Sequence, residues 1–217
     1  PPLVLAYHGV ALVPFDEDRF RLFVAPSQIA RDIAWLRRRG YQLVTFAELA
    51  TRVSACGPAE ASDLAALTFD DGLADNRWNL LPVLQHHEAP ATVFPVSEWL
   101  SGRHPDGAEA AILTADDLRA LHAAGVEIGG HGAGHLDLRT LADADLQADL
   151  SRSRADLEAT IDAEVTSFAY PFGHADDRVR RAVAAAGFEH ACRTSGEGNW
   201  DAPFDLPRQA MGTGASV

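Results

Sequence analysis

Two short polar segments hold the residues of this sequence whose types and spacing best suit chemistry. The first, Thr68-Phe-Asp-Asp-Gly72, places two carboxylates side by side after an apolar run. Adjacent carboxylates repel each other, so they persist beside a buried strand when solvent or a cation separates their charges. The competing interpretation is that Asp71 caps a helix after Gly72 while Asp70 is merely solvated. This segment alone leaves both interpretations open.

The second segment, His131-Gly-Ala-Gly-His135, has two histidines four positions apart. Two imidazoles at this spacing can bind one metal ion. Glycines at positions 129, 130, 132 and 134 give the loop little order of its own, which a bound ion would supply. Isolated histidine pairs are more commonly solvated loop residues, so this segment has modest specificity by itself.

Together the two segments provide one carboxylate and two imidazoles, a set that leaves open positions on a metal ion. A catalytic zinc needs three protein ligands and a free site for water. The second carboxylate of the pair is then available as a general base beside that water. An iron-dependent oxygenase also uses two histidines and one carboxylate, but it gives the extra carboxylate no role. The combined set therefore favours a metal-dependent enzyme.

The apolar pattern predicts strands and helices in alternation along the chain. The strands are continuously apolar, which is typical of a parallel sheet covered by helices. Ser27 is expected to cap the first helix, Thr114 and Asp117 to form a capping box, and 97–113 to be a loop. The expected strands are 3–7, 41–45, 64–69, 91–96, 126–128, 166–169 and 188–192, with helices between Ser27 and Gly40, over 46–53, 74–87, 144–161 and 176–186, and from Thr114 onward.

The chemically promising residues follow the predicted strands directly, and this placement favours one architecture. An open doubly wound sheet fits the alternation as well as a barrel does. A β/α barrel, however, builds its active site at the carboxyl ends of its strands. We therefore expect a barrel in one domain spanning 1–217, with these residues at one end: His8, Asp70, Asp71, His131 and Tyr170.

The chain resembles the polysaccharide deacetylases of carbohydrate esterase family 4, which share the NodB homology domain. The two segments above resemble the first two motifs of that family, and Ser167-Phe-Ala-Tyr-Pro-Phe-Gly173 resembles the third. Gly187-Phe188 and Leu206-Pro-Arg208 resemble its downstream segments. The likeness implies an α/β fold, a distorted (β/α)7 barrel. It also implies a hydrolase that releases acetate from an N-acetylated sugar or polysaccharide.

The resemblance also implies roles by position. Asp70 would be the general base, and the metal would be zinc, with cobalt or nickel as alternatives. The backbone N–H of Phe172 would donate to the oxyanion. The implied metal ligands are Asp71, His131 and His135, and the implied groove wall is Tyr170, Pro171 and Phe172.

The chain departs from the family pattern at three places. Gly132 stands where the second motif usually has Ser or Thr. Ala169 stands where the third motif often has an Arg that orients the base, and Arg208 or Arg193 could replace it. The last motif normally provides a histidine near the C-terminus, but none follows His190.

The missing histidine has a counterpart near the start of the chain. Leu5-Ala-Tyr-His8 resembles the last motif moved to the front, as in the circularly permuted exopolysaccharide deacetylases. His8 is then the expected general acid, unless it is a core histidine bonded to a carbonyl. Trp200 could belong to a sugar platform or to the core, and His174 could touch substrate. Two other functions stay open, a silent carbohydrate-binding protein on the same fold and an O-acetyl esterase of the xylan type.

Composition narrows the range of partners. The 217 residues carry a formal net charge of −13, which argues against nucleic acid and against a polybasic membrane contact. No apolar run reaches transmembrane length, and no signal segment is visible, so the compartment stays undetermined. Cys56 and Cys192 could form a disulfide, but two small core residues are the simpler expectation.

Overall fold

The computed structural model describes residues 1–14, 16–18, 20–103, 111–194 and 198–212, with nothing said of the side chains at 101–103. A ring of parallel strands forms its centre. Strands pair in the order β12-β1-β5-β6-β9, and β10 pairs with β11. The strands of this ring are β1 (Leu3–Tyr7), β5 (Leu64–Asp71), β6 (Thr92–Pro95), β9 (Glu127–Ile128), β10 (Ser167–Ala169), β11 (His190–Cys192) and β12 (Gln209–Ala210).

Two single bridges close the ring. Gly130 pairs with Phe168 and joins the end of β9 to β10, while Cys192 pairs with Leu206 and joins β11 to the segment that continues into β12. The result is the distorted barrel of seven strands that the family resemblance implies. Its members differ from the strands expected from the apolar pattern: β12 is not among those expected, and the strand expected over 41–45 is a short segment that pairs with β5 off the ring path. The distortion arises because β9 and β12 are only two residues long, so neighbouring strands share few ladder hydrogen bonds there.

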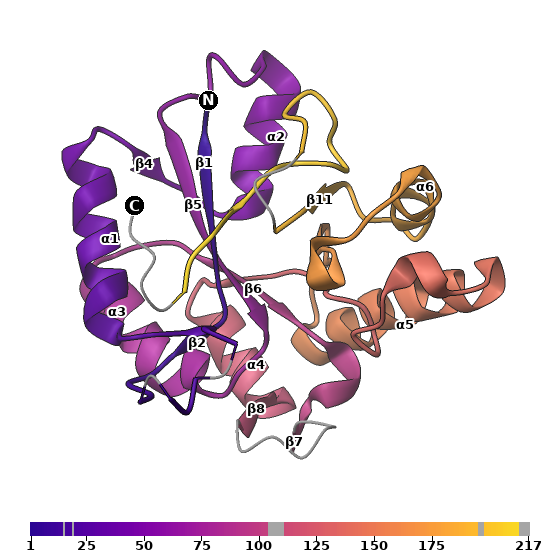
Figure 1. Ribbon diagram of the computed structural model, residues 1–217, viewed down its shortest axis with the longest axis horizontal. Helices are drawn as coiled ribbons and strands as arrows, with labels where there is room; N and C mark the ends of the chain where they lie inside the picture. Colours follow the sequence, from indigo (N-terminus) through magenta and orange to yellow (C-terminus); the bar gives the residue numbers. More distant parts are fainter. Residues whose placement is uncertain (15, 19, 104–110, 195–197, 213–217) are drawn as a thin grey trace.

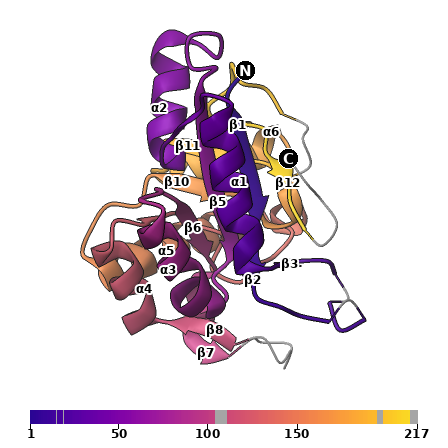
Figure 2. The same cartoon turned by 90° about the vertical axis from the view of Figure 1, so that its left-hand side faces the viewer.

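Helices surround the strands, as Figures 1 and 2 show. Two short strand pairs lie outside the ring at the end where β1 finishes, and they border the rim of the barrel (Figure 2). The helices are α1 (Pro26–Arg38), α2 (Phe46–Cys56), α3 (Leu81–His86), α4 (Ala115–Ala123), α5 (Asp143–Ile161) and α6 (Asp177–Ala185). The outer strands are β2 (Gly9–Val10) with β3 (Phe23–Val24) and β7 (Ser101–Arg103) with β8 (Ala111–Thr114), and β4 (Gln42–Leu43) pairs with the start of β5.

Several local expectations need correction. The segment 97–113 is not simply a loop, because it contains a 3-10 turn, η2 (Ser97–Trp99), and the antiparallel strands β7 and β8, while 104–110 lies outside the described residues. The first helix begins at Pro26 with Ala25 as its cap, so Ser27 is not the cap. The capping box of Thr114 and Asp117 is confirmed.

The remaining short elements lie in loops that follow the ring strands. A π-helix, η1, precedes α3, one 3-10 turn follows the second motif, and another forms the end of the third motif. Their bounds are η1 (Asn76–Leu80), η3 (Leu138–Thr140) and η4 (Pro171–Gly173).

Apolar side chains fill both the barrel and the space beneath the helices. The inside of the barrel holds small and aromatic residues such as Ala66, Phe94 and Cys192. The larger cluster outside packs α1, α4, α5 and α6 against the strands. Cys192 is a buried core residue as expected, but Cys56 is exposed, and both thiols are free. None of the described helices is long and apolar enough to cross a membrane.

Candidate active site

The two adjacent carboxylates diverge because the backbone turns between them. Side chains alternate along β5, and Thr68 and Asp70 both face the inside of the barrel, where they meet Arg208. Asp71 ends the strand with a φ of 71°, in the left-handed region, and Gly72 follows with a φ of 78°. A Cβ at Gly72 would lie 2.8 Å from the Cβ of Pro95, so this turn needs glycine. Asp71 therefore reaches the rim while Asp70 stays inside.

Asp70 forms a buried ion pair with Arg208. The guanidinium donates through Nη1 and Nη2 to the two carboxylate oxygens, each at 2.7 Å. The other three N–H groups of Arg208 donate to Thr68 Oγ1 at 3.0 Å, Thr194 Oγ1 at 2.9 Å and the Arg193 carbonyl at 2.8 Å. Both side chains are almost fully buried. Arg208 thus has all five donors satisfied and fills the position that Ala169 leaves without an arginine.

This ion pair fixes the charge of Asp70. Burial alone would raise the pKa of the carboxyl, but the guanidinium of Arg208, helped by His131 and His8, holds the pKa below its usual range. Asp70 is therefore ionised near neutral pH and able to accept a proton. Because Arg208 is itself buried and fully bonded, its side chain does not line a substrate groove, which corrects the expectation that it contacts substrate.

Asp71, His131 and His135 converge at the rim of the barrel. One carboxylate oxygen, Asp71 Oδ1, lies 3.4 Å from Nε2 of each histidine. Zinc ligands at about 2.0–2.2 Å on a tetrahedron lie about 3.3–3.6 Å apart, so this spacing fits one ion. The same oxygen is buried and accepts no hydrogen bond from any described residue. The three side chains therefore suit a divalent cation.

The histidine rings are also oriented as ligands. His131 Nδ1 lies 2.7 Å from the Ala169 carbonyl oxygen, so this nitrogen donates and the lone pair of Nε2 faces Asp71. Burial lowers the pKa of His135 to about 4, and the nearby His131 acts in the same direction. Burial would also lower the pKa of His131, but the adjacent carboxylate of Asp71 and the charge of Asp70 raise it. A cation would compete with the proton that these carboxylates attract to His131.

The loop between the two histidines is held from α5. The carboxylate of Asp149 accepts the backbone N–H groups of Ala133 and Gly134, both at 3.1 Å. A Cβ at Gly132, whose φ is 77°, would lie 3.1 Å from Asp149 Oδ2. The backbone hydrogen bonds from Ser97 to Gly132 and from Glu98 to Ala133 hold the other side of the loop. Asp149 thus supplies the support that the absent Ser or Thr at position 132 would give.

His8 lies beside the carboxylate pair, immediately after β1. Burial is the largest influence on Asp70 and Asp71, yet the charge of His8 acts to lower the pKa of both. The side chain is partly buried, and its Nδ1 is fully covered without a hydrogen-bond partner among the described residues. The structure therefore brings His8, near the front of the chain, to the two carboxylates of the candidate site.

The third motif places one exposed ring at the site and buries another. Phe172, with a φ of 60°, is 56% exposed, and its ring centroid lies 4.7 Å from that of His135. Pro171 is buried behind it. Tyr170 is fully buried, and its hydroxyl donates to the Phe204 carbonyl at 2.8 Å. The side chain of Tyr170 therefore belongs to the core and does not form a groove wall, contrary to the expectation.

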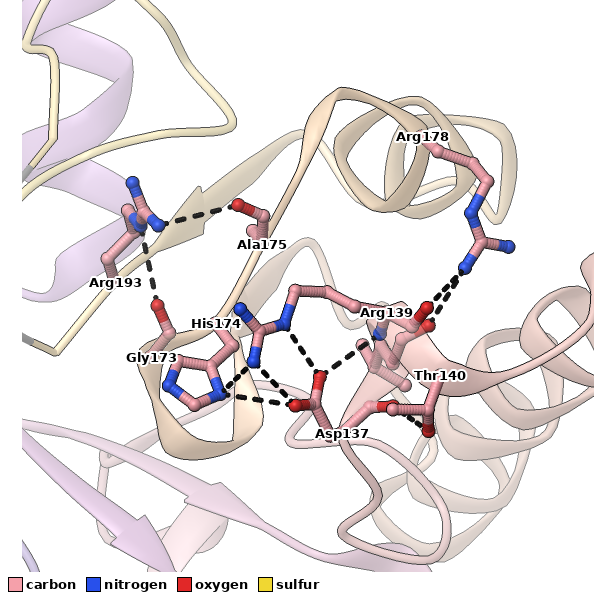
Figure 3. Close-up of polar contacts among 9 residues, drawn as sticks. Asp137, Arg139, Thr140, Gly173, His174, Ala175, Arg178 and Arg193 are labelled. Atoms are coloured by element: carbon pink, nitrogen blue, oxygen red, sulfur yellow. Dashed lines mark hydrogen bonds and ion pairs between the residues drawn. The ribbon is translucent and has the colours of Figure 1, made fainter.

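Polar contacts tie the loop of the second motif to the loop of the third (Figure 3). Arg139 donates to Asp137 through Nε at 3.0 Å and Nη2 at 2.7 Å, and this Nη2 lies 2.8 Å from His174 Nδ1. From the other side, Arg193 donates to the carbonyls of Gly173 and Ala175. The segment that carries Phe172 is thereby anchored to the segment after His135. His174 is half-exposed at this rim.

Trp200 lies away from these residues. Its ring packs on the apolar cluster that contains Val4 and Phe46, and it lines a hollow of about 440 Å³ beside Pro2 and Leu3. These residues begin β1, whereas His8 follows its end. Trp200 is therefore partly buried against the core near the start of β1, away from the candidate metal ligands, which argues against a sugar platform at this site.

Several residues of the site carry no signal that sequence reasoning detected. Trp99 has its ring centroid 5.2 Å from that of His135. Asp149 looks like any exposed helix carboxylate in the sequence. Thr194 looks like an ordinary loop residue. Each reaches the site from a segment distant in the sequence, so only the fold reveals it.

The comparison with known families decides what kind of protein carries this site. Residues 58–191, more than half of the chain, match the family described as polysaccharide deacetylase. The chain belongs to the polysaccharide deacetylase family. The match covers all three motifs, from Asp70 to Phe172, and it lies on the ring strands that hold them.

Individual relatives agree with this assignment. The chain is 24% identical over 192 residues, 88% of its length, to YxkH of Bacillus subtilis (strain 168), whose name carries the same family term. It is 34% identical over 98 residues, 45% of its length, to the poly-beta-1,6-N-acetyl-D-glucosamine N-deacetylase of Escherichia coli (strain K12). The chain spans 63% and 14% of the lengths of these two curated relatives.

A solved structure shows the same fold over nearly the whole chain. The deacetylase PplD of Streptococcus pyogenes, in complex with acetate, superposes with a TM-score of 0.84 at 20% identity. The likeness covers 98% of this chain and 92% of that one. The ring of strands described above is therefore the fold of a known deacetylase structure.

Proposed function

We propose that this protein is a metal-dependent N-deacetylase of a polymer of N-acetylated sugars, with Asp71, His131 and His135 as the metal ligands. The observation that carries the proposal is the separation of the two carboxylates. One oxygen of Asp71 lies 3.4 Å from Nε2 of each of two histidines. Asp70 instead binds Arg208, whose positive charge stabilises the ionised form of its carboxyl group. A ligand set with an independent, charged base is what the hydrolysis of an amide requires.

The chain's own residues supply the remaining steps. A divalent ion, when bound, polarises the acetyl carbonyl and lowers the pKa of water. Asp70 accepts the proton of the water that attacks the carbonyl carbon. The backbone N–H of Phe172 donates to the oxygen that gains charge. As the C–N bond breaks, His8 gives its proton to the departing nitrogen, and the products are acetate and a free amine.

Two observations support this function over a silent carbohydrate-binding protein. The absent arginine of the third motif, one of the two departures behind that alternative, has a counterpart in Arg208, which donates to both oxygens of Asp70. Burying the Asp70–Arg208 ion pair also costs desolvation energy, and a surface that only binds carbohydrate does not require such a pair. The 34% identity to an enzyme named for poly-beta-1,6-N-acetyl-D-glucosamine favours an amide substrate, and β-1,6-linked N-acetylglucosamine as the first polymer to examine.

The test is acetate release by the zinc-loaded protein. The substrates are β-1,6-linked N-acetylglucosamine oligomers, chitin oligomers, peptidoglycan and acetylated xylan, with the Asp70→Asn variant as the control. We expect release from at least one N-acetylated polymer and a loss of about 10²–10⁴ in the variant. Release from acetylated xylan alone would identify an O-acetyl esterase instead. No release from any substrate by metal-loaded protein would reject the enzyme.

A further inference from the structure

Side chains of Asp75 and of the adjoining turn η1 hold the backbone around His8. Asn76 Nδ2 donates to the His8 carbonyl at 3.1 Å, and Asp75 Oδ1 accepts the Val10 N–H at 3.0 Å. Asn79 Nδ2 donates to the Val10 carbonyl at 2.9 Å. Three side chains between Asp75 and Asn79 thus bind backbone groups of His8 and Val10. A π-helical turn is rare and often marks a functional site.

The same segment connects the two ends of the proposed proton path. Asp70 and Asp71 end β5, and η1 begins at Asn76, five residues after Asp71. A short stretch of chain therefore carries the base, a metal ligand and the contacts to His8. Movement of His8 relative to Asp70 would require this stretch to deform.

Asn76 and His8 each have a polar atom that the described structure leaves without a partner. Asn76 is completely buried, and Nδ2 bonds to His8 and to Asp75 Oδ1 at 2.9 Å. Its other polar atom, Oδ1, is buried with no donor among the described residues, and His8 Nδ1 is buried with no acceptor among them. A buried, unpaired polar atom costs about 1–3 kcal/mol, so its persistence needs a reason. Asn76 Oδ1 can accept a hydrogen bond, and His8 Nδ1 can donate one when it carries a proton. The two residues are already joined by the hydrogen bond from Asn76 Nδ2 to the His8 carbonyl.

We propose that Asn76 is the positioning residue of His8, a role that rests on the proposed function of His8 as the general acid. Asn76 Nδ2 fixes the backbone of His8, and Asn76 Oδ1 accepts the Nδ1–H of its ring, directly or through one bridging water. Since Nδ1 is covered while His8 is partly exposed, Nε2 is the nitrogen that can reach substrate. An acceptor at Nδ1 favours the Nδ1–H tautomer, the form that remains after Nε2 has given its proton away.

A neutral amide suits this role better than a carboxylate. The site already holds Asp70 and Asp71 close to His8, and Asp75 lies next to Asn76. A further negative charge at Nδ1 would hold the proton on the ring more tightly. The carbonyl oxygen of Asn76 orients the ring without adding that charge.

The tautomer of His8 tests the contact independently of activity. Imidazole ¹⁵N chemical shifts of the wild type, assigned with His8→Gln, should show neutral His8 with its proton on Nδ1. In Asn76→Ala the proton should move to Nε2, and in Asn76→Ser, which keeps a hydroxyl acceptor, part of the Nδ1–H form should return. A wild-type His8 with its proton on Nε2 would overturn the proposal, whether or not the variants fold.

Kinetics then test the positioning role. With unchanged zinc content, Asn76→Ala should lose about 10- to 100-fold in N-deacetylation, below the 10²–10⁴ for removing an acid entirely. Hydrolysis of an aryl acetate, whose leaving group needs no proton, should change little. Equal losses on both substrates would show a structural role and overturn the proposal. If the wild type deacetylates nothing while His8 is Nδ1–H, the proposed function fails and the contact with Asn76 stands.

Discussion

Replacing Arg208 by methionine tests the energetic centre of this site. The variant keeps most of the side-chain volume but removes the guanidinium that donates twice to Asp70 at 2.7 Å. It leaves a buried carboxylate without its counter-charge, which costs about 3–5 kcal/mol. A chain of this size loses about 2–4 °C in Tm per kcal/mol, so Tm should fall by about 6–20 °C. The expected loss of about 3–5 kcal/mol is a large share of the free energy of unfolding of a typical domain, about 5–15 kcal/mol.

The assay is urea unfolding of chelator-treated protein, which excludes any contribution from bound metal. Arg208→Met, Asp70→Asn and the double variant form a cycle that isolates the pair. Each single variant leaves one buried charge unpaired, whereas the double variant leaves none. We expect the double variant to lose at least about 2 kcal/mol less than the sum of the single variants. Losses that add within about 0.5 kcal/mol would refute the idea that the two charges stabilise each other.

The pH dependence of the same variant provides a second check. Arg208 holds the pKa of Asp70 below its usual range against burial, which would raise it. A depressed pKa gives stability that is present above the unfolded value of about 3.9 and lost as pH falls through the folded value. In Arg208→Met, burial would dominate and raise the pKa. The stability difference from wild type should therefore be largest near pH 7 and shrink as pH falls toward about 4. A difference that stays constant with pH would contradict this account.

Three further predictions concern the other residues of the site. Asp70→Asn should keep its zinc, measured by elemental analysis, while its rate of acetate release falls by about 10²–10⁴. His131→Ala should lose both zinc and activity in the same two assays. Full zinc occupancy in His131→Ala would remove that residue from the ligand set. His8→Ala should reduce N-deacetylation by about 10²–10⁴ and spare most hydrolysis of an aryl acetate, and equal losses with metal retained would exclude the acid role. Asp149→Asn should weaken zinc binding by about 10- to 100-fold in a chelator competition, because the loop between the two histidines loses one of its hydrogen-bond acceptors. The control is Asp145→Asn on the exposed face of the same helix, which should bind zinc like the wild type.

The sequence was sufficient for the parts of this protein that depend on local pattern. Continuous apolar runs predicted β1, β5, β6 and β10, since a strand buried on both faces needs apolar side chains at successive positions. The polar residues at the ends of those runs indicated the barrel and its working end. The spacing of the two histidines and the adjacent carboxylates identified the candidate ligands, because these residues lie within short segments.

The tertiary structure decided whatever depends on contacts between distant segments. Arg208 and Asp70 are 138 positions apart, so no local pattern could choose Arg208 over Arg193 as the partner of the base. The left-handed backbone of Asp71 breaks the alternation of β5, and it separates two carboxylates that look equivalent in the sequence. Trp200 packs near the start of β1 because the chain after it leads into β12, which pairs with β1 and closes the ring. A two-residue strand leaves almost no periodic signal, and its pairing partners determine where it lies.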